Sequence, residues 1–222
     1  ISFLSFVKSK FTHHRYDQEN EWGLKSDKIY SITTMTDGMM WVATGFGLEM
    51  LSPDGIREYD YDKSALGVNY IIDLEIVNDE ILWVATDKGV LKINTMTDMI
   101  TRFSKSDTLP DTRRLSDNLI HDILPIHDNV WVATGSGVVI IDTSSNKVTN
   151  FSSDLIARVI TQDDDGDIWL GTEMDGLYMI PSNLLANIIN GENFEIEGHV
   201  FDPDYPNGIS SSQITCVSQD KD

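Results

Sequence analysis

The sequence WVATGFGLEML at residues 41–51 decides the fold, because three further copies of the same phrase follow it along the chain. The copies are WVATDKGVLKI from Trp83, WVATGSGVVII from Trp131 and WLGTEMDGLYMI from Trp169. The four tryptophans recur at intervals of 42, 48 and 38 residues, close to the period of about 40–50 residues typical of four-stranded propeller blades. The repeat therefore predicts an all-β propeller of four-stranded antiparallel blades.

Each tryptophan lies in the second of four short apolar segments, and turns rich in Gly, Asn and Asp separate these segments. Such spacing is typical of antiparallel meanders. No stretch shows a sustained helical period except the insertion at 182–190, which predicts a short helix. The first segments of the four units, expected to be their first strands, are 29–35, 70–77, 119–126 and 156–162.

The repeats divide the chain into four complete blades and a fragment at each end, all in one propeller segment over residues 1–222. The fragment at 10–16 resembles a fourth strand, and the fragment at 208–222 repeats the lead-in sequence of 115–123. Because a propeller closes with about four to eight blades, we expect these blades to be part of a larger propeller. The expected blades are approximately 26–60, 69–104, 116–152 and 154–202.

The repeated tryptophan and threonine are expected to have structural roles. The indole would fill the space between neighbouring blades, and the threonine hydroxyl would bind nearby backbone. These structural repeat residues are Trp41, Thr44, Trp83, Thr86, Trp131, Thr134, Trp169 and Thr172.

Composition excludes some classes of function. Sixteen basic and 36 acidic residues give a formal net charge of −20, which disfavours binding to nucleic acid. No window approaches the roughly 18 apolar residues of a membrane span. The apolar opening at 1–7 is compatible with an edge strand or with the remnant of an export signal. Cys216 is the single cysteine, so no internal disulfide forms, as in the cytosol or in a periplasmic protein that needs none.

A longer phrase surrounds each tryptophan: Leu-Ser-x-Asn-x-Ile-x-x-Ile, then Asp-x-x-Gly-x-x-Trp-x-Gly-Thr-x-x-Gly-Leu. Residues 153–180 follow it most fully, and the copies at 26–51, 69–93 and 116–141 have alanine in place of the glycine before threonine. This pattern resembles the two-component regulator propeller repeat over nearly the whole chain.

The resemblance implies a place in the periplasmic sensor region of hybrid histidine kinases, found mostly in gut Bacteroidetes. There, seven-bladed propellers precede a β-sandwich, a membrane helix and cytoplasmic kinase modules. The implied role is detection of glycan breakdown products, with a phosphorelay that controls transcription of polysaccharide-use genes. A small glycan or oligosaccharide ligand, a homodimer formed through the parent protein, and membrane attachment through that parent are implied as well.

Two other classes of function stay open. A propeller lyase would need a histidine and an acid at the mouth of the channel. His121 lies near the start of an inner strand and could face the channel, but the pattern favours a structural histidine there. A protein-interaction scaffold would need neither. The sequence contains no catalytic constellation, so we expect this segment to have no enzymatic activity, no cofactor and no metal.

The run Asp163 to Asp167 resembles the start of a calcium-binding loop. However, the twelfth position counted from Asp163 is Met174 and not the required glutamate. The run also occupies the hairpin position held by residues 36–38 in the first unit. The pattern therefore favours a simple turn over a calcium site.

Propellers bind ligands at the mouth of the central channel, where loops from every blade converge. We expect the turns between second and third strands to lie there, with the connections at 60–69, 104–118 and 203–212. An aromatic ring beside polar groups suits a sugar. The candidate ligand-binding residues are Phe46, Tyr61, Lys88, Arg113, Arg114, Ser136, Glu173, Met174 and Asp175.

Overall fold

A computed structural model describes residues 13–16, 19, 23–55, 57–106, 108–152, 155–190, 197–199 and 208–220. The apolar opening and the first residues of the partial blade at 10–16 lie outside the described residues, as does the first half of the connection at 203–212. Within the described opening fragment, Tyr16 forms an isolated parallel bridge with Leu24.

The described chain contains four antiparallel sheets, each with its strands in sequence order. Blade 1 consists of β1 (Ile29–Thr34), β2 (Met40–Thr44), β3 (Gly47–Leu51) and β4 (Arg57–Asp62). Blade 2 consists of β5 (Ile71–Val77), β6 (Ile81–Thr86), β7 (Gly89–Asn94) and β8 (Met99–Phe103). Blade 3 consists of β9 (Ile120–Ile126), β10 (Asn129–Thr134), β11 (Gly137–Asp142) and β12 (Val148–Ser152). Blade 4 consists of β13 (Ala157–Gln162), β14 (Ile168–Thr172), β15 (Leu177–Ile180) and β16 (Glu197–His199).

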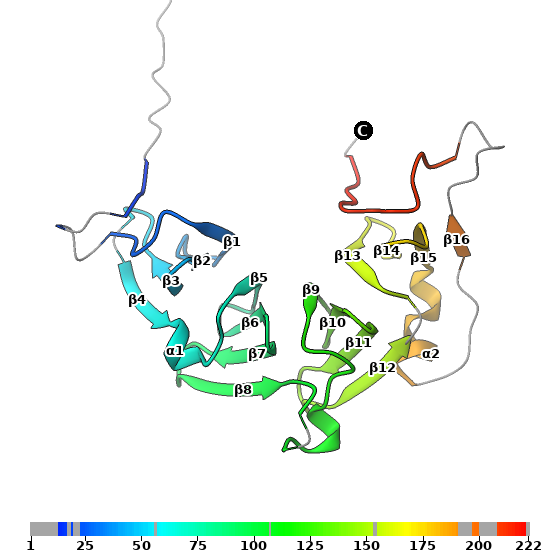
Figure 1. The fold of residues 1–222 in the computed structure, drawn as a ribbon, viewed down its shortest axis with the longest axis horizontal. Helices are drawn as coiled ribbons and strands as arrows, with labels where there is room; N and C mark the ends of the chain where they lie inside the picture. The colour runs from blue at the N-terminus through cyan, green and yellow to red at the C-terminus, as the bar shows by residue number, and fades with distance from the viewer. Residues whose placement is uncertain are drawn as a thin grey trace, which may run out of the picture.

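The blades stand side by side in an arc (Figure 1). Strands β1, β5, β9 and β13 lie along the inside of the arc, and β4, β8, β12 and β16 lie along its outside. Each inner strand contacts the inner strand of the next blade. The predicted all-β propeller of four-stranded blades is confirmed.

The helices are short. The insertion after blade 4's third strand forms η2 (Ser182–Leu184) and α2 (Leu185–Ile189), as the sequence predicts. The helical period does not predict the additional turn α1 (Lys63–Leu66). It forms because the Asp62 carboxylate accepts the N–H of Ala65 at 2.8 Å, which satisfies a donor at the start of the helix.

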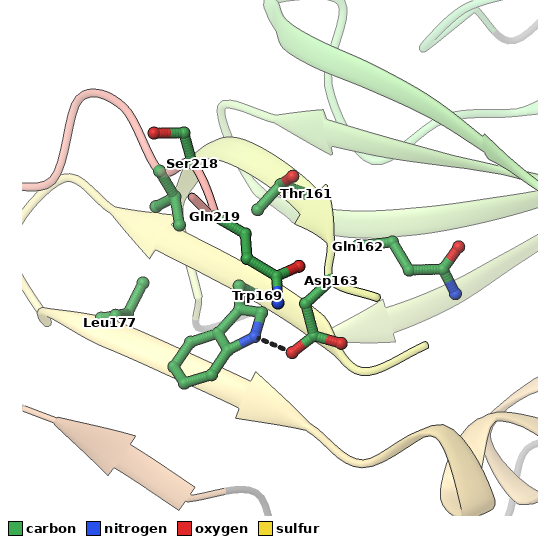
Figure 2. A pocket seen from close by; sticks show the side chains of 8 residues that line it. Thr161, Gln162, Asp163, Trp169, Leu177, Ser218 and Gln219 are labelled. Carbon is green, nitrogen blue, oxygen red and sulfur yellow. Dashed lines mark hydrogen bonds between the residues drawn. The ribbon is translucent and has the colours of Figure 1, made fainter. Parts of the chain in front are cut away.

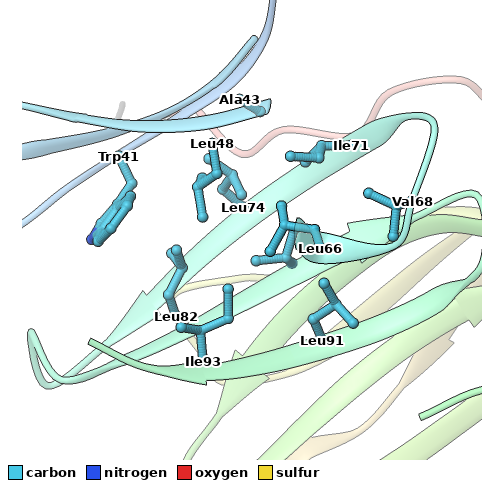
Figure 3. Packing of buried hydrophobic residues seen from close by; sticks show 11 residues of the cluster. Trp41, Ala43, Leu48, Leu66, Val68, Ile71, Leu74, Leu82, Leu91 and Ile93 are labelled. Atoms are coloured by element: carbon cyan, nitrogen blue, oxygen red, sulfur yellow. The ribbon is translucent and has the colours of Figure 1, made fainter. Parts of the chain in front are cut away.

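The hydrophobic core lies between blades. Trp41 and Leu48 of blade 1 pack with Leu66, Leu74 and Leu82, which come from blade 2 and the connection before it (Figure 3). A second cluster joins blades 2 and 3 around Trp83, and a third joins blades 3 and 4 around Trp131. Both faces of the intervening sheets are therefore buried, so their strands are apolar on both sides.

Each repeated tryptophan also packs on a ring from the outermost strand of its own blade. Trp83 and Phe103 have ring centroids 5.6 Å apart, and Trp131 and Phe151 have centroids 5.4 Å apart. The corresponding partner of Trp169 is His199, at 6.4 Å. The repeat thus places one ring pair at the same position in every blade, with Trp41 and Tyr61 as the fourth pair at 6.3 Å.

Residues 208–220 lie against blade 4 in the position of a following blade's lead-in. The N–H of Gly176 donates to the carbonyl of Ser212 at 2.8 Å. The same contact joins blade 2 to the lead-in of blade 3, where the N–H of Gly89 donates to the carbonyl of Asn118 at 3.0 Å. The segment 208–222 resembles 115–123 in sequence. Its described part, 208–220, also lies against blade 4 as the lead-in of blade 3 lies against blade 2.

Candidate functional site

The turns between second and third strands form one rim of the arc, which we call the upper rim (residues 45–46, 87–88, 135–136 and 173–176). Each turn is tied to its own threonine, and all four threonines are fully buried. The hydroxyls of Thr86 and Thr134 each donate to the carbonyl of the following glycine at 2.7 Å. They also accept backbone N–H groups of their turns. The repeated threonine therefore fixes the shape of the loop that would face a ligand.

The inner strands carry a β-bulge at the same place in every blade, near the upper rim. The register with the neighbouring strand shifts between Ile29 and Ser31 in blade 1, and at the equivalent positions in the other three. A bulge leaves one residue unpaired and re-aims its side chain. The bulged residues are Tyr30, Ile72, His121 and Arg158.

Two of these bulged residues join a polar cluster with a residue of the upper rim. The guanidinium of Arg158 contacts Glu173 Oε1 at 2.7 Å and His121 Nδ1 at 3.3 Å. Arg158 and Glu173 are each 38% exposed, so solvent can reach both ends of the ion pair. Burial lowers the pKa of His121, and the positive charge of Arg158 lowers it further. The charges of Glu173 and Asp117 act in the opposite direction but do not cancel this lowering, so the neutral imidazole is favoured.

A depression of about 620 Å³ opens beside this cluster, between the blade 4 turn and the C-terminal segment. Its wall combines one carboxylate, one thioether and several hydroxyls. Met174 is 78% exposed there, which leaves its apolar side chain available for contact. The lining residues are Glu173, Met174, Ser210, Ser211, Ser212 and Gln213.

Other predicted residues of the upper rim contact neighbouring chain rather than open space. Lys88 Nζ donates to the carbonyl of Gly67 at 3.0 Å, and Ser136 Oγ donates to Asp117 at 2.9 Å. The ring of Phe46 carries the Lys25 ammonium 4.4 Å from its centroid. The N–H of Asp175 donates to Thr172 at 2.8 Å and shapes the turn. The side chains of Lys88, Ser136 and Phe46 therefore brace the loops of the rim, whereas the side chain of Asp175 is exposed.

Three predicted ligand residues lie away from the rim. Tyr61 lies in β4 and not in a connection; its ring packs on Trp41, and its hydroxyl donates to Asp98 of blade 2 at 2.8 Å. Arg113 ends the short helix η1 (Asp111–Arg113), which contacts the outermost strand β12. Arg114 bends back onto Asp111 at 3.1 Å. The structure therefore gives Tyr61 an interblade role and places the two arginines on the outer side of blade 3.

The acidic run beginning at Asp163 is a hairpin turn. Asp163 Oδ1 accepts the N–H groups of Asp165 at 3.1 Å and Asp167 at 2.9 Å, and Oδ2 accepts Trp169 Nε1 at 2.7 Å. These bonds lower the pKa of Asp163, the bond from Trp169 most of all. Within the described residues, no group of three or more His, Cys, Asp or Glu side chains is arranged to hold a metal ion.

A second cavity, of about 310 Å³, lies between blade 4 and the C-terminal segment (Figure 2). Trp169 forms part of its wall. The equivalent face of Trp41 in blade 1 is covered by Leu74 and Leu82 of blade 2. The cavity therefore occupies an interblade packing position and is a poor candidate for a ligand site. Its lining residues are Thr161, Gln162, Asp163, Trp169, Leu177, Val217, Ser218 and Gln219.

Sequence reasoning misses Arg158 as a site residue, and it favours a structural role for His121 over a role in a lyase site. Both lie inside segments predicted as strands, where alternation alone does not reveal a bulge. The repeat itself carries the missing signal. Aligning the four inner strands, with a gap of one residue for the shorter hairpin of blade 3, shows that the position of Arg158 carries Tyr30, Ile72 and His121 in the other blades, and that the residue before it is apolar in all four.

The segment that contains Arg158 and Glu173 also relates the chain to known proteins. Residues 150–174 match the family model described as "Two component regulator propeller". The matched residues run from the end of β12 to the turn after β14, so this part of the chain is similar to that family. No curated protein matches the chain significantly.

Several solved structures share the propeller architecture of this chain. The extracellular domain of the putative hybrid two component system BT3049 from B. thetaiotaomicron is 18% identical with a TM-score of 0.71, over 94% of this chain. The extracellular domain of BT4673 from the same organism is 16% identical with a TM-score of 0.69, over 90% of this chain. The chain spans 26% of the length of each of those structures.

A more distant likeness is to an enzyme. Virginiamycin B lyase from Staphylococcus aureus is 16% identical with a TM-score of 0.56, over 82% of this chain and 58% of the lyase. At these identities the structural matches establish the propeller fold. Among the helices of the described residues, none has the length and apolar character needed to cross a bilayer.

Proposed function

We propose that this chain is a non-catalytic, ligand-sensing propeller region of a hybrid two-component histidine kinase and response regulator. It would lie in the periplasm, outside the inner membrane, and detect glycan breakdown products to control polysaccharide-use genes. The parent protein would supply the membrane anchor, the kinase and the homodimer contacts. Support comes from the family match and from the two extracellular domains of putative hybrid two component systems.

The single observation that supports a saccharide ligand is the His121–Arg158–Glu173 cluster beside the hydroxyl-lined depression. Neutral sugars present many hydroxyls, which bind well to planar charged groups held in fixed positions. The ion pair holds Arg158 and Glu173 in place at 2.7 Å while each stays partly exposed. The exposed thioether of Met174 can pack against the apolar face of a sugar ring. A sensor then requires that the ligand bind its two signalling states unequally.

Binding of oligosaccharides produced by digestion of polysaccharides tests this function. The wild-type chain should bind one class of oligosaccharide on an array, and calorimetry should give its Kd. The Glu173→Gln and Arg158→Gln variants should each weaken that binding by about tenfold to a hundredfold, because a hydrogen bond to a charged group is worth about 1.5–3 kcal/mol.

A matched control is Asp165→Asn, which removes one charge from the turn at the other end of β13. It should leave the Kd unchanged. If no oligosaccharide class binds, or if Asp165→Asn weakens binding as much as the two site variants do, the cluster is not a saccharide site. A stoichiometric protein partner captured instead would favour the interaction scaffold.

A lyase is the second candidate, and one observation favours it. His121 is held neutral beside Arg158 and Glu173, and a neutral imidazole can accept a proton. Virginiamycin B lyase itself is catalytically inactive as a histidine-to-alanine variant, whose structure holds quinupristin. Turnover of quinupristin, abolished in His121→Ala, would establish this activity. Absence of turnover in the wild type would remove it.

A further inference from the structure

One chain of hydrogen bonds crosses the inner strands of all four blades. Ser31 Oγ on β1 donates to Asp73 Oδ1 on β5 at 2.9 Å. Asp122 Oδ2 on β9 accepts the backbone N–H of Ile160 on β13 at 2.7 Å. Between these two bonds, Asp73 and Asp122 occupy equivalent positions on the adjacent strands β5 and β9, and Asp73 raises the pKa of Asp122 through its charge and through side-chain hydrogen bonding. This series of hydrogen bonds therefore runs from blade 1 to blade 4, and the two carboxyl groups form its middle link.

The side chains of Ser31, Asp73 and Asp122 occupy equivalent positions in three blades, so the series of hydrogen bonds follows from the repeat. Ser31 pairs with Ala43, Asp73 with Ala85 and Asp122 with Ala133. Each lies directly after the bulged residue of its strand. The bulge places these side chains at one level of adjacent inner strands, where a short carboxylate can reach the next blade.

The middle link needs a proton. Ionised carboxylates are acceptors only, so two of them cannot hydrogen-bond each other. Asp73 already accepts the hydroxyl of Ser31, and Asp122 accepts the N–H groups of Ile123 at 3.0 Å and Ile160 at 2.7 Å. A proton shared between the two carboxyl oxygens supplies the donor that this link requires.

We propose that Asp73 and Asp122 share one proton and act as a pH-sensitive latch between blades 2 and 3, which sets the geometry of the channel at the upper rim. With the proton present, the two inner strands are joined. When it leaves, two adjacent negative charges face each other and push β5 and β9 apart. The latch needs no ligand and does not rest on the proposed sensing function.

The surroundings favour the protonated form near neutral pH. Burial raises the pKa of Asp122 to about 7, and the charge of Asp73 and the hydrogen bond to it add to the effect, against the lowering by the N–H of Ile160. Burial likewise raises the pKa of Glu75, the next channel-side residue of β5, to about 7, with help from Asp73 and Asp122.

The facing groups from the other packed strands are few among the described residues. Strand β1 contributes the neutral Ser31, β9 contributes His121, and β13 contributes Arg158. Arg158 is paired with Glu173, and His121 is held neutral. Asp73 and Asp122 both act on Glu75, so three carboxyl groups gather at this level, while the cation of Arg158 is paired with Glu173.

The latch is close to the candidate site. Asp122 follows His121 in β9, and Ile160 is two residues from Arg158 in β13. A movement of β9 relative to β13 would change the 3.3 Å contact between Arg158 and His121. Proton release would therefore alter the polar cluster at the upper rim without any change in that cluster's own residues.

The direction of the pH effect follows from linkage. Asp122 has a higher pKa in the folded chain than its ordinary value of 3.8, so the folded state binds the proton more tightly. This contribution to stability is complete below about pH 4 and is lost as the pH rises through about 7. The folded chain should therefore melt at a lower temperature at pH 8 than at pH 5.

Thermal melting and infrared spectroscopy of the full chain test the latch. In the wild type, the melting temperature should fall by at least about 3 °C between pH 5 and pH 8. At pH 6 the infrared spectrum should show the carbonyl stretch of a protonated carboxylic acid, and Asp122→Asn should remove one component of it. Asp122→Asn and Asp73→Asn should each reduce the pH dependence of melting, because asparagine is neutral at every pH.

The control is Asp128→Asn, which removes one exposed carboxylate from the turn after β9 and should keep the wild-type pH dependence. The latch is overturned if the wild type shows no acid carbonyl band at pH 6, or if Asp122→Asn and Asp128→Asn share one pH profile. Should Asp122→Asn fail to fold, the wild-type band and the Asp73→Asn melting profile decide the matter.

Discussion

Gly171 on β14 lies directly opposite Val159 on β13. A methyl group added to Gly171 would lie 2.7 Å from Val159 Cγ1 and 2.6 Å from Ile214 Cγ2. The other three blades have alanine at this position, opposite Ser31, Asp73 and Asp122. Glycine and a larger opposite residue therefore replace alanine and a polar one in blade 4, which explains the single departure within the repeated Trp-x-Ala-Thr phrase.

We expect Gly171→Ala to destabilise the chain, although alanine is normally better than glycine in a strand by about 0.5–1 kcal/mol. The clash with Val159 and Ile214 is an overpacking effect, which costs about 1–3 kcal/mol. Urea unfolding should therefore show a net loss of about 1–2 kcal/mol. The double variant Gly171→Ala with Val159→Ala should recover part of the loss. A single variant more stable than the wild type would contradict this packing.

Asp163→Ala should lower the melting temperature, because it removes the acceptor of Trp169 Nε1 and of two backbone N–H groups. The main cost arises from the indole N–H, which would lose its acceptor at the wall of the cavity beside the C-terminal segment. Tryptophan fluorescence recorded during heating measures the change in melting temperature. Asp164→Ala, on the exposed side of the same turn, should have the same melting temperature as the wild type. Equal losses in both variants would mean that only the net charge matters.

The fold is predictable because each blade is encoded locally. Trp83, Thr86 and Gly89 fix the second strand, its buried turn and the start of the third strand within seven residues, and the same spacing recurs in the next blade. The predicted first strand of blade 3, 119–126, differs from the observed Ile120–Ile126 by one residue. Periodicity of this kind requires no knowledge of distant contacts.

The site is less predictable because it depends on where strands end and bulge. The sequence predicts Tyr61 in a connection, but β4 continues through Asp62 and the ring enters the interblade space on Trp41. Alternation predicts an ordinary strand residue at Arg158, while the bulge between Ala157 and Val159 re-aims it toward Glu173. Both outcomes depend on pairing between strands, which spacing along the sequence does not specify.

Glu75→Gln should stabilise the chain at pH 8 and leave it unchanged at pH 4. The folded pKa of Glu75 is about 7, above the ordinary 4.5, so ionisation above neutral pH weakens the folded state. Glutamine has the same shape and no charge. Melting temperatures at the two pH values measure the effect, with Glu80→Gln as a control on the exposed turn after β5. A stabilisation of equal size at pH 4 would point to altered packing and not to ionisation.

Arg158→Gln should raise the pKa of His121, which two-dimensional NMR of the imidazole can follow. Burial is the larger cause of the lowered pKa and would persist, but the repulsion from the guanidinium would vanish. Glu173 would also lose the cation 2.7 Å away, so its charge would act more strongly on the imidazolium. Both changes favour protonation, so the titration should move toward higher pH. Lys147→Gln removes an exposed cation from blade 3 and should leave the titration of His121 in place; a common shift in both variants would trace the effect to net charge instead of to the contact.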